Sequence, residues 1–226
     1  FVGYPEVPDD EYLFEIKKYA RKRNVCLSGT GVWNDFAISD PVKRAYFIQL
    51  VKNWIEAAAK MGIEVLRVFS GTPPEGYEES SRPMIIRQIV DCLKICALHA
   101  QKYGVILGVQ HHADMLRTAD ETIELIEMVG SPWVGVILDT GNLMSEDPYE
   151  DMNKLMPYVV GWQLKESVFG WNLTEKIDLD KIMQIVLKHN YRGYLPVETL
   201  NTGTRKYNPY EIAVSYTHLT LPTKLE

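Results

Sequence analysis

The chain of 226 residues has few cysteines and no apolar run long enough to cross a membrane. A membrane-spanning helix needs about 20 consecutive apolar residues, and none of the runs here approaches that length. Cys92 and Cys96 lie one helical turn apart and Cys26 lies in an apolar stretch, which is neither a Cys-X-X-Cys pair nor a secreted disulfide framework. We therefore expect a protein that is not integral to a membrane, with three thiols in its core.

Basic charge is also scarce. The chain carries 24 Lys and Arg against 30 Asp and Glu, which gives a net charge of -6 and a pI near 5.5. Nucleic-acid binders usually present a basic face, and no cluster of Lys and Arg stands out here. A glycine-rich phosphate cradle is missing as well. The composition favours a small-molecule ligand over a nucleic acid.

The sequence opens at Phe1 without an initiator methionine and in the middle of a structural pattern, because residues 1–4 look like the tail of a strand. We therefore expect an earlier strand and helix to lie outside it, and a cytoplasmic location with export left open. The hydrophobic content of 46% is enough for one sizeable core, hence about one domain.

Apolar, β-forming runs alternate with helical patterns along the whole chain. We predict helices at 11–23, 41–61, 83–103, 118–130, 148–155 and 178–190, and strands at 25–32, 64–70, 105–110, 134–139, 159–164 and 194–199. Such alternation indicates right-handed βαβ units and a parallel sheet. A doubly wound sheet would normally show a glycine-rich fingerprint after an early strand, and none is present.

We therefore predict an α/β fold, a TIM (β/α)8 barrel that lacks its first strand and helix, over residues 1–213. The last strand of such a barrel should be followed by a helix, but residues 214–226 break the helical pattern. We interpret this tail as non-native sequence, with an irregular native tail as the alternative.

Four successive predicted strands end in polar side chains. In a parallel barrel the carboxyl ends of all strands meet at one rim, which is where barrel enzymes place their chemistry. The residues at these strand ends are Gln110 and His112, Asp139, Gln163 and Lys165, and Glu198.

The motifs GVQHHAD, VILDTGN, GWQLKES and LPVETL contain these residues in this order. Together they resemble the sugar phosphate isomerase/epimerase family, the xylose-isomerase-like TIM barrels that include endonuclease IV and inosose dehydratase. The resemblance runs from about residue 1 to residue 210 and is specific for the family rather than for a substrate.

The resemblance implies a divalent metal held by a Glu, an Asp, a His and a Glu. Those positions fall on Gln110, Asp139, Gln163 and Glu198, so two of the four ligands are altered. An all-oxygen set with two carboxylates suits Mg²⁺ or Mn²⁺ better than Zn²⁺, which favours nitrogen and sulfur. We expect weaker metal binding than the family pattern provides.

The altered ligands also limit the chemistry. Family epimerases use both metal-bound glutamates as acid and base, and Gln110 cannot transfer a proton. Glu198 remains as the base, with His112 and Lys165 as candidates for the second proton or for enolate stabilisation. The resemblance therefore implies a metal-assisted isomerase of a sugar or keto sugar, with a lyase or hydratase reaction also open.

Several other residues are candidates for substrate contacts. Aromatic rings often cover the C–H face of a sugar, and arginines bind anionic groups. The candidates are Trp33, Asn34 and Phe36 after an early strand, Arg67 in the next strand, Asn142 beside Asp139, and Trp171 in a later loop.

Each assignment has a structural alternative. Asp139 also suits a turn, Gln110 and Gln163 also suit a hydrogen-bonded core without metal, and Lys165 also suits an ion pair with a carboxylate. His111 should point away from the site and pack beneath a helix.

Three functions remain open at this stage. A sugar isomerase fits best, and a metal-free carbohydrate-binding barrel is the main alternative because of the two glutamines. An endonuclease IV-like enzyme fits poorly, because it needs several histidines and a basic DNA face. The partner is thus expected to be a sugar, with no nucleic acid and no membrane, in a possible homo-oligomer.

Overall fold

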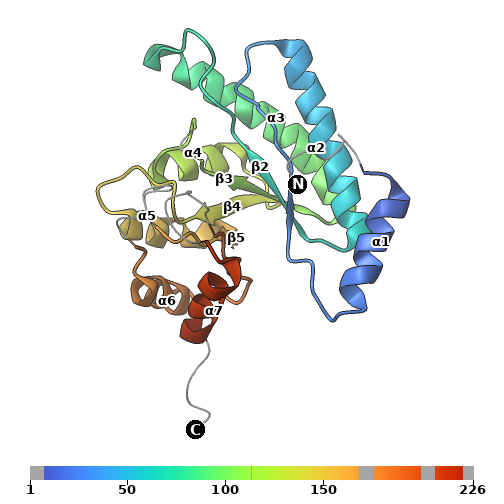
Figure 1. Cartoon of the computed structure of the whole chain (residues 1–226). Coiled ribbons are helices and arrows are strands. Elements are labelled where there is room, and N and C mark those ends of the chain that lie inside the picture. Colours follow the sequence, from blue (N-terminus) through green and yellow to red (C-terminus); the bar gives the residue numbers. More distant parts are fainter. Residues whose placement is uncertain (1–7, 113, 168–175, 200–206, 221–226) are drawn as a thin grey trace.

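A curled parallel sheet forms the centre of the molecule (Figure 1). The computed structural model describes residues 8–112, 114–167, 176–199 and 207–220, with the side chains of the last segment described up to residue 216. The five strands follow the chain order and all neighbours pair in parallel. They are β1 (Thr30–Gly31), β2 (Val65–Phe69), β3 (Ile106–Gln110), β4 (Val134–Asp139) and β5 (Val159–Gln163).

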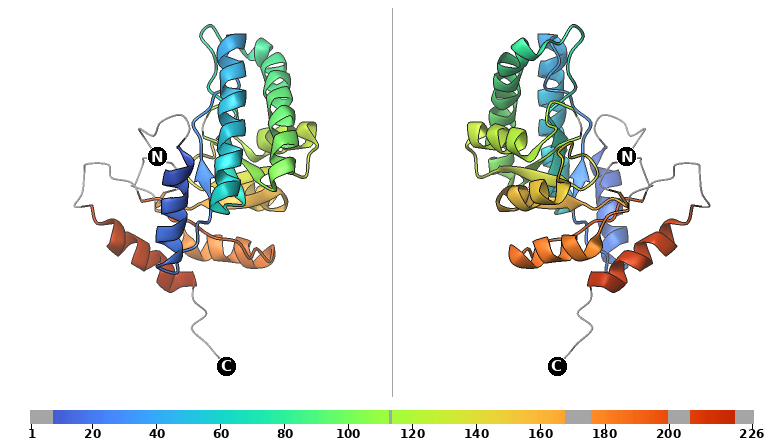
Figure 2. Two further views of the ribbon diagram at one scale, coloured as in Figure 1. Left: turned by 90° about the vertical axis from the view of Figure 1, so that its right-hand side faces the viewer. Right: turned by 90° about the vertical axis from the view of Figure 1, so that its left-hand side faces the viewer.

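Helices alternate with the strands and cover the outer face of the sheet (Figures 1 and 2). Two short 3-10 helices, Glu79–Ser81 and Met156–Tyr158, precede α3 and β5. In the described part of the chain, no helix is long and apolar enough to cross a membrane. The helices are α1 (Asp10–Arg21), α2 (Pro41–Met61), α3 (Arg82–Tyr103), α4 (Ala119–Val129), α5 (Pro148–Leu155), α6 (Leu179–Lys188) and α7 (Pro209–Thr220).

Local sequence signals fix the helix ends. The Asp40 carboxylate accepts hydrogen bonds from the first backbone N–H groups of α2, and Gly62 ends that helix in the left-handed conformation. Thr118 and Glu121 form the predicted capping box at the start of α4. These caps define where α2 and α4 begin and where α2 ends.

Side chains alternate between the two faces of each strand. In β3, Leu107 and Val109 are buried in the hydrophobic core, whereas Gly108 and Gln110 have the opposite parity and face the barrel interior. A side chain built on Gly108 would meet the tip of Ile137 from β4, so these two residues share one interior layer. The next interior position along each strand lies at the rim, and there the side chains are polar.

Two predicted strands are much shorter than expected. Of the strand predicted at 25–32 only Thr30–Gly31 pairs, and of the one at 194–199 only Val197 forms a bridge, with Leu164. Val25 is exposed and lies outside the paired part of this segment. An apolar segment stays in a sheet only where a neighbouring strand pairs with its backbone hydrogen-bonding groups. The described sheet is therefore a partial barrel.

The cysteines and the C-terminal helix differ in part from the expectations. Cys92 and Cys96 are buried in α3 as expected, but Cys26 is exposed because it precedes β1 on an unpaired stretch. Helix α7 crosses the boundary placed at residue 213, and the non-native origin of the tail stays a prediction. The strand expected at 1–4 lies outside the described residues.

Candidate active site at the carboxyl ends of the strands

The register of the sheet brings the polar strand ends together. Gln110 lies beside Ile137 in β4, and Asp139 lies beside Gln163 in β5. The bridge between Leu164 and Val197 then sets Glu198 next to the end of β5, where its N–H donates to the Leu164 carbonyl at 2.8 Å. Four strand ends thus deliver their side chains to one place.

Asp139 is the centre of this cluster and is fully buried. Its Oδ2 accepts hydrogen bonds from Gln110 Nε2 and from Asn142 Nδ2 at 2.6 Å, and it forms an ion pair with Lys165 Nζ at 3.0 Å. Its Oδ1 accepts from the Gly141 N–H at 2.9 Å, which is also turn chemistry. The acid is therefore both part of the turn and part of the polar cluster.

Lys165 lies between two carboxylates. Its side chain is 7% exposed, and Nζ lies 3.0 Å from Asp139 Oδ2 and 3.5 Å from Glu198 Oε2. The same Glu198 oxygen accepts a hydrogen bond from Gln163 Nε2 at 2.7 Å. The Lys165 N–H donates to Thr140 Oγ1 at 2.9 Å, which ties its backbone to the end of β4.

Arg67 joins the cluster from β2. Its Nη1 donates to Gln110 Oε1 at 3.2 Å, and its guanidinium lies 4.6 Å from the centre of the Phe69 ring. Burial lowers the pKa of Arg67, while the negative charges of Glu198 and Asp139 act in the opposite direction. Arg67 Nε is buried without a hydrogen-bond partner among the described residues.

An aromatic group borders the cluster. Trp33 is 66% exposed, and its ring lies 4.9 Å from that of Phe69 and 6.3 Å from that of His112. His112 is exposed and stands edge-on to Phe69 at 5.3 Å. The structure thus places two of the expected residues, Trp33 and His112, where a sugar face could rest on them.

The other expected contact residues lie elsewhere. Asn34 is buried, and its amide both donates to and accepts from the backbone of Phe69, at 2.8 and 2.9 Å, so it extends the sheet. Phe36 is fully buried and offers no surface to a ligand in this arrangement. Both lie in a loop, where sequence alone does not fix side-chain direction. Trp171 lies outside the described residues.

Two buried titratable residues support the site from behind. His111 is fully buried, and its Nε2 accepts a hydrogen bond from the Asp139 N–H at 3.2 Å. Burial lowers the pKa of His111, and the charge of Asp139 opposes this shift. Burial raises the pKa of Asp114, whose Oδ1 accepts from the Leu116 N–H at 3.0 Å. Asp114 is the last residue of the GVQHHAD motif, but the motif assigned it no role.

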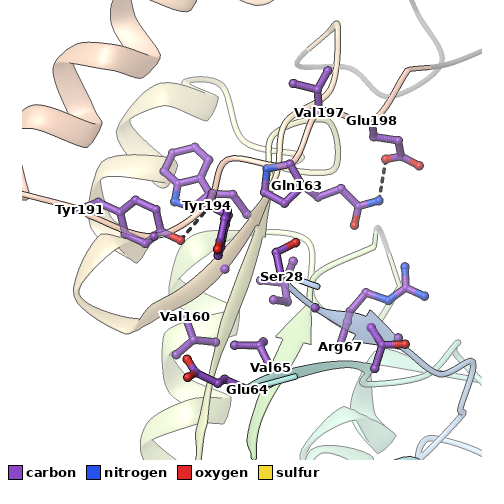
Figure 3. Close-up of a pocket in the computed structure, with 18 of the residues that line it drawn as sticks. Ser28, Glu64, Val65, Arg67, Val160, Gln163, Tyr191, Tyr194, Val197 and Glu198 are labelled. Atoms are coloured by element: carbon purple, nitrogen blue, oxygen red, sulfur yellow. Dashed lines mark hydrogen bonds between the residues drawn. The ribbon is translucent and has the colours of Figure 1, made fainter. Parts of the chain in front are cut away.

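A cavity of about 700 Å³ opens beside the cluster, between β1 and residues 191–198. Figure 3 shows Gln163, Glu198 and Arg67 toward one end of it, and Glu64 and Val160 toward the other. Tyr191 and Tyr194, which the sequence did not single out, line its side. Its volume lies in the range typical of small-molecule sites.

A polar cluster at the carboxyl ends of a curled parallel sheet lies where barrel enzymes in general place their active sites. The model of one family of barrels matches residues 3–216, nearly the whole chain. The chain belongs to the xylose isomerase-like TIM barrel family. This confirms the predicted family and fold, and the described sheet forms part of the barrel. No curated protein sequence matches the chain significantly.

Solved structures of this barrel fold resemble the chain at low sequence identity. The 3-keto-D-glucoside 4-epimerase of E. coli has a TM-score of 0.75 and 14% identity, with 93% of this chain and 83% of that chain covered. A D-psicose 3-epimerase in the presence of D-fructose also has a TM-score of 0.75, with 18% identity over 92% and 75% of the two chains. An IOLI protein with a bound zinc atom has a TM-score of 0.75 and 16% identity, with 92% of this chain and 80% of that chain covered.

The family pattern of a metal site does not fit the residues of this chain. The four ligand positions do come together, but two carry amides, each of which donates a hydrogen bond to a carboxylate. The Lys165 ammonium lies between the two carboxylates, where a bound cation would be. Throughout the described ranges, no group of three or more His, Cys, Asp and Glu could hold a metal. In the expected set of Gln110, Asp139, Gln163 and Glu198, both carboxylates are therefore already contacted by Lys165 and by an amide, which disfavours a divalent ion at this place.

Proposed function

We propose that this chain is a sugar or keto-sugar isomerase that moves a proton at the carbon next to a carbonyl group, with Glu198 as the base. The observation that carries this proposal is the Glu198 carboxylate, which lines the cavity beside a buried ammonium group. Membership of the xylose isomerase-like family and the likeness to sugar epimerases support it.

The two carboxylate oxygens of Glu198 have different surroundings. The contacts described for its side chain, from Gln163 and Lys165, both use Oε2. Oε1 can therefore take the proton of a substrate C–H bond. At 34% exposure, the Glu198 side chain is reachable from the cavity without a rearrangement of the core.

The electrons of the broken C–H bond move to the carbonyl oxygen and form an enediolate. Two cations can stabilise that negative charge, namely the buried Lys165 and the partly buried Arg67. Glu198 then returns the proton to the neighbouring carbon on the same face, while a proton passes between the two oxygens. Atoms and charge balance without an external oxidant or reductant.

A single base favours isomerisation over epimerisation. Inversion at a carbon by two bases requires a second proton carrier on the opposite face, and the amide of Gln110 cannot act as one. Loss of a hydroxyl group from the same enediolate, a lyase reaction, also needs only one base. The Mn²⁺ or Mg²⁺ expected from the family resemblance takes no part in this proposed reaction, because Lys165 lies between the carboxylates.

Trp33 and His112 complete the proposed substrate site. The exposed Trp33 ring offers an apolar face for sugar C–H groups, and His112 stands beside it as a hydrogen-bonding group. Together with Arg67 they suit a molecule that has one apolar face and several oxygens. The cavity of about 700 Å³, which Arg67 and Glu198 line, lies in the size range of small-molecule sites.

The test is deuterium incorporation from D₂O into a panel of aldoses, ketoses and 3-keto sugars, followed by NMR. Wild-type protein should exchange the proton next to the carbonyl of at least one sugar. Glu198→Gln should reduce that exchange by 10²-fold or more, since a positioned base contributes roughly that much. Glu124→Gln, an exposed acid on α4, serves as the matched control and should exchange like wild type.

A carbohydrate-binding barrel without turnover is the second candidate. The observation in its favour is that each glutamine amide donates to a carboxylate, as in a closed structural network. Saturable sugar binding by calorimetry, together with no deuterium exchange in any sugar of the panel, would favour this candidate over the isomerase.

A further inference from the structure

We infer that the Lys165 ammonium takes the place of the divalent metal in this barrel, so that the site has a built-in cation and does not bind a metal tightly. The inference that Lys165 also binds the substrate carbonyl rests on the proposed function. The inference that Lys165 occupies the metal position does not rest on that function, because it follows from the contacts of Lys165 alone.

The position of Lys165 is fixed from three sides. Its backbone N–H is held by Thr140, and the residue before it is paired through the bridge to Val197. Its Nζ contacts one oxygen of Asp139 and lies within ion-pair distance of one oxygen of Glu198. A cation shared by carboxylates from two different strands is the arrangement that a metal ion has in such a site.

The two glutamines agree with this assignment. Gln110 and Gln163 direct their amide NH₂ groups at the same carboxylates that Lys165 contacts, and Arg67 donates to the Gln110 carbonyl. Carboxylates that accept this many hydrogen bonds have few lone pairs left for a metal. For a divalent ion to bind, both amides would have to turn and the ammonium would have to move away. The positive charges of Lys165 and Arg67 would also repel the ion.

Lys165 also has a donor left for a substrate. An ammonium group has three N–H bonds, and two of them have acceptors among the described residues, Asp139 and Glu198. The third can donate to a carbonyl or enediolate oxygen near the Glu198 base. A site of this kind binds a single substrate oxygen, whereas a metal ion can chelate two neighbouring oxygens.

The experiment is a calorimetric titration of Mn²⁺, and separately of Mg²⁺, into chelator-treated protein without any sugar. Wild type should show no saturable binding up to about 1 mM. Gln110→Glu adds a carboxylate but keeps the lysine, and Gln110→Glu/Lys165→Ser also clears the cation position. The double variant should bind Mn²⁺ at least 10-fold more tightly than Gln110→Glu alone, with circular dichroism as the check of folding.

Two results would overturn the inference. One is saturable Mn²⁺ or Mg²⁺ binding by wild type below 1 mM that Asp139→Ala abolishes. The other is a folded double variant that binds Mn²⁺ no better than Gln110→Glu. If the double variant does not fold, the wild-type titration alone decides. Because no substrate is present, failure here is distinct from a failure of the deuterium exchange that tests the proposed function.

Discussion

At the scale of single residues, Lys165 holds the candidate site together. Removal of one partner of a buried ion pair leaves an uncompensated charge, which typically costs about 3–5 kcal/mol. Lys165→Met should therefore lower the free energy of unfolding by about 3 kcal/mol, because Asp139 is fully buried beside it. Urea denaturation measures this change.

Two further variants check the reason for that loss. Lys165→Met/Asp139→Asn also removes the uncompensated buried charge of Asp139, so it should recover part of the lost free energy. Lys154→Met breaks a surface pair with Asp120 and should change stability by little or nothing. Equal losses in Lys165→Met and in the double variant would contradict the ion-pair account.

Asp114 makes stability depend on pH. Burial raises its pKa in the folded protein above the value near 3.9 of an unfolded chain, so the folded state holds its proton more tightly. The stabilisation is complete below the unfolded pKa and is lost as pH rises through the folded pKa. Its size is about 1.4 kcal/mol for each pKa unit of the shift.

Asp114→Asn should remove this pH dependence. The amide oxygen can still accept from the Leu116 N–H, and no buried charge forms at neutral pH. We expect the variant to be more stable than wild type at pH 7, and we expect this advantage to be smaller near pH 4. Urea denaturation at several pH values measures the difference. Identical pH profiles for the two proteins would show that Asp114 does not titrate differently on folding.

At the scale of elements, the interior layer of the sheet depends on small residues. A Cβ on Gly108 would lie 2.5 Å from Ile137 Cδ1, closer than atoms normally approach. Gly108→Ala should therefore cost about 1–3 kcal/mol through overpacking. In Gly108→Ala/Ile137→Ala both clashing atoms of Ile137, Cδ1 and Cγ1, are absent, and thermal unfolding should show a smaller loss than the sum of the two single changes. If the double variant loses as much stability as the two single variants together, the side chain of residue 137 is not the source of the clash.

The period of two along the strands made most of the site predictable. Once β3, β4 and β5 were recognised, Gln110, Asp139 and Gln163 had to share one face at one rim. The direction of Asn34 and Phe36 was not predictable, because loop side chains are placed by contacts from distant parts of the chain. The two short strands were over-predicted because apolar composition does not show whether a pairing partner exists.

At the scale of the whole molecule, the parallel sheet, its outer helices and the rim of polar residues form a barrel fold that many enzymes share. The fold and the family therefore do not determine the reaction, which depends on the side chains at the rim. Here the sequence showed that two family ligands are glutamines. The structure adds that Lys165 bridges the two remaining carboxylates, an arrangement that sequence spacing left as one alternative among several.

The most direct measurement is the rate of deuterium incorporation into the best sugar of the panel, compared in EDTA and in 1 mM Mn²⁺. Our account predicts equal rates in the two conditions for wild type, and loss of exchange in Glu198→Gln under both. Exchange that appears only with Mn²⁺ would contradict the built-in cation. The absence of exchange in every sugar and in both conditions would contradict the isomerase itself.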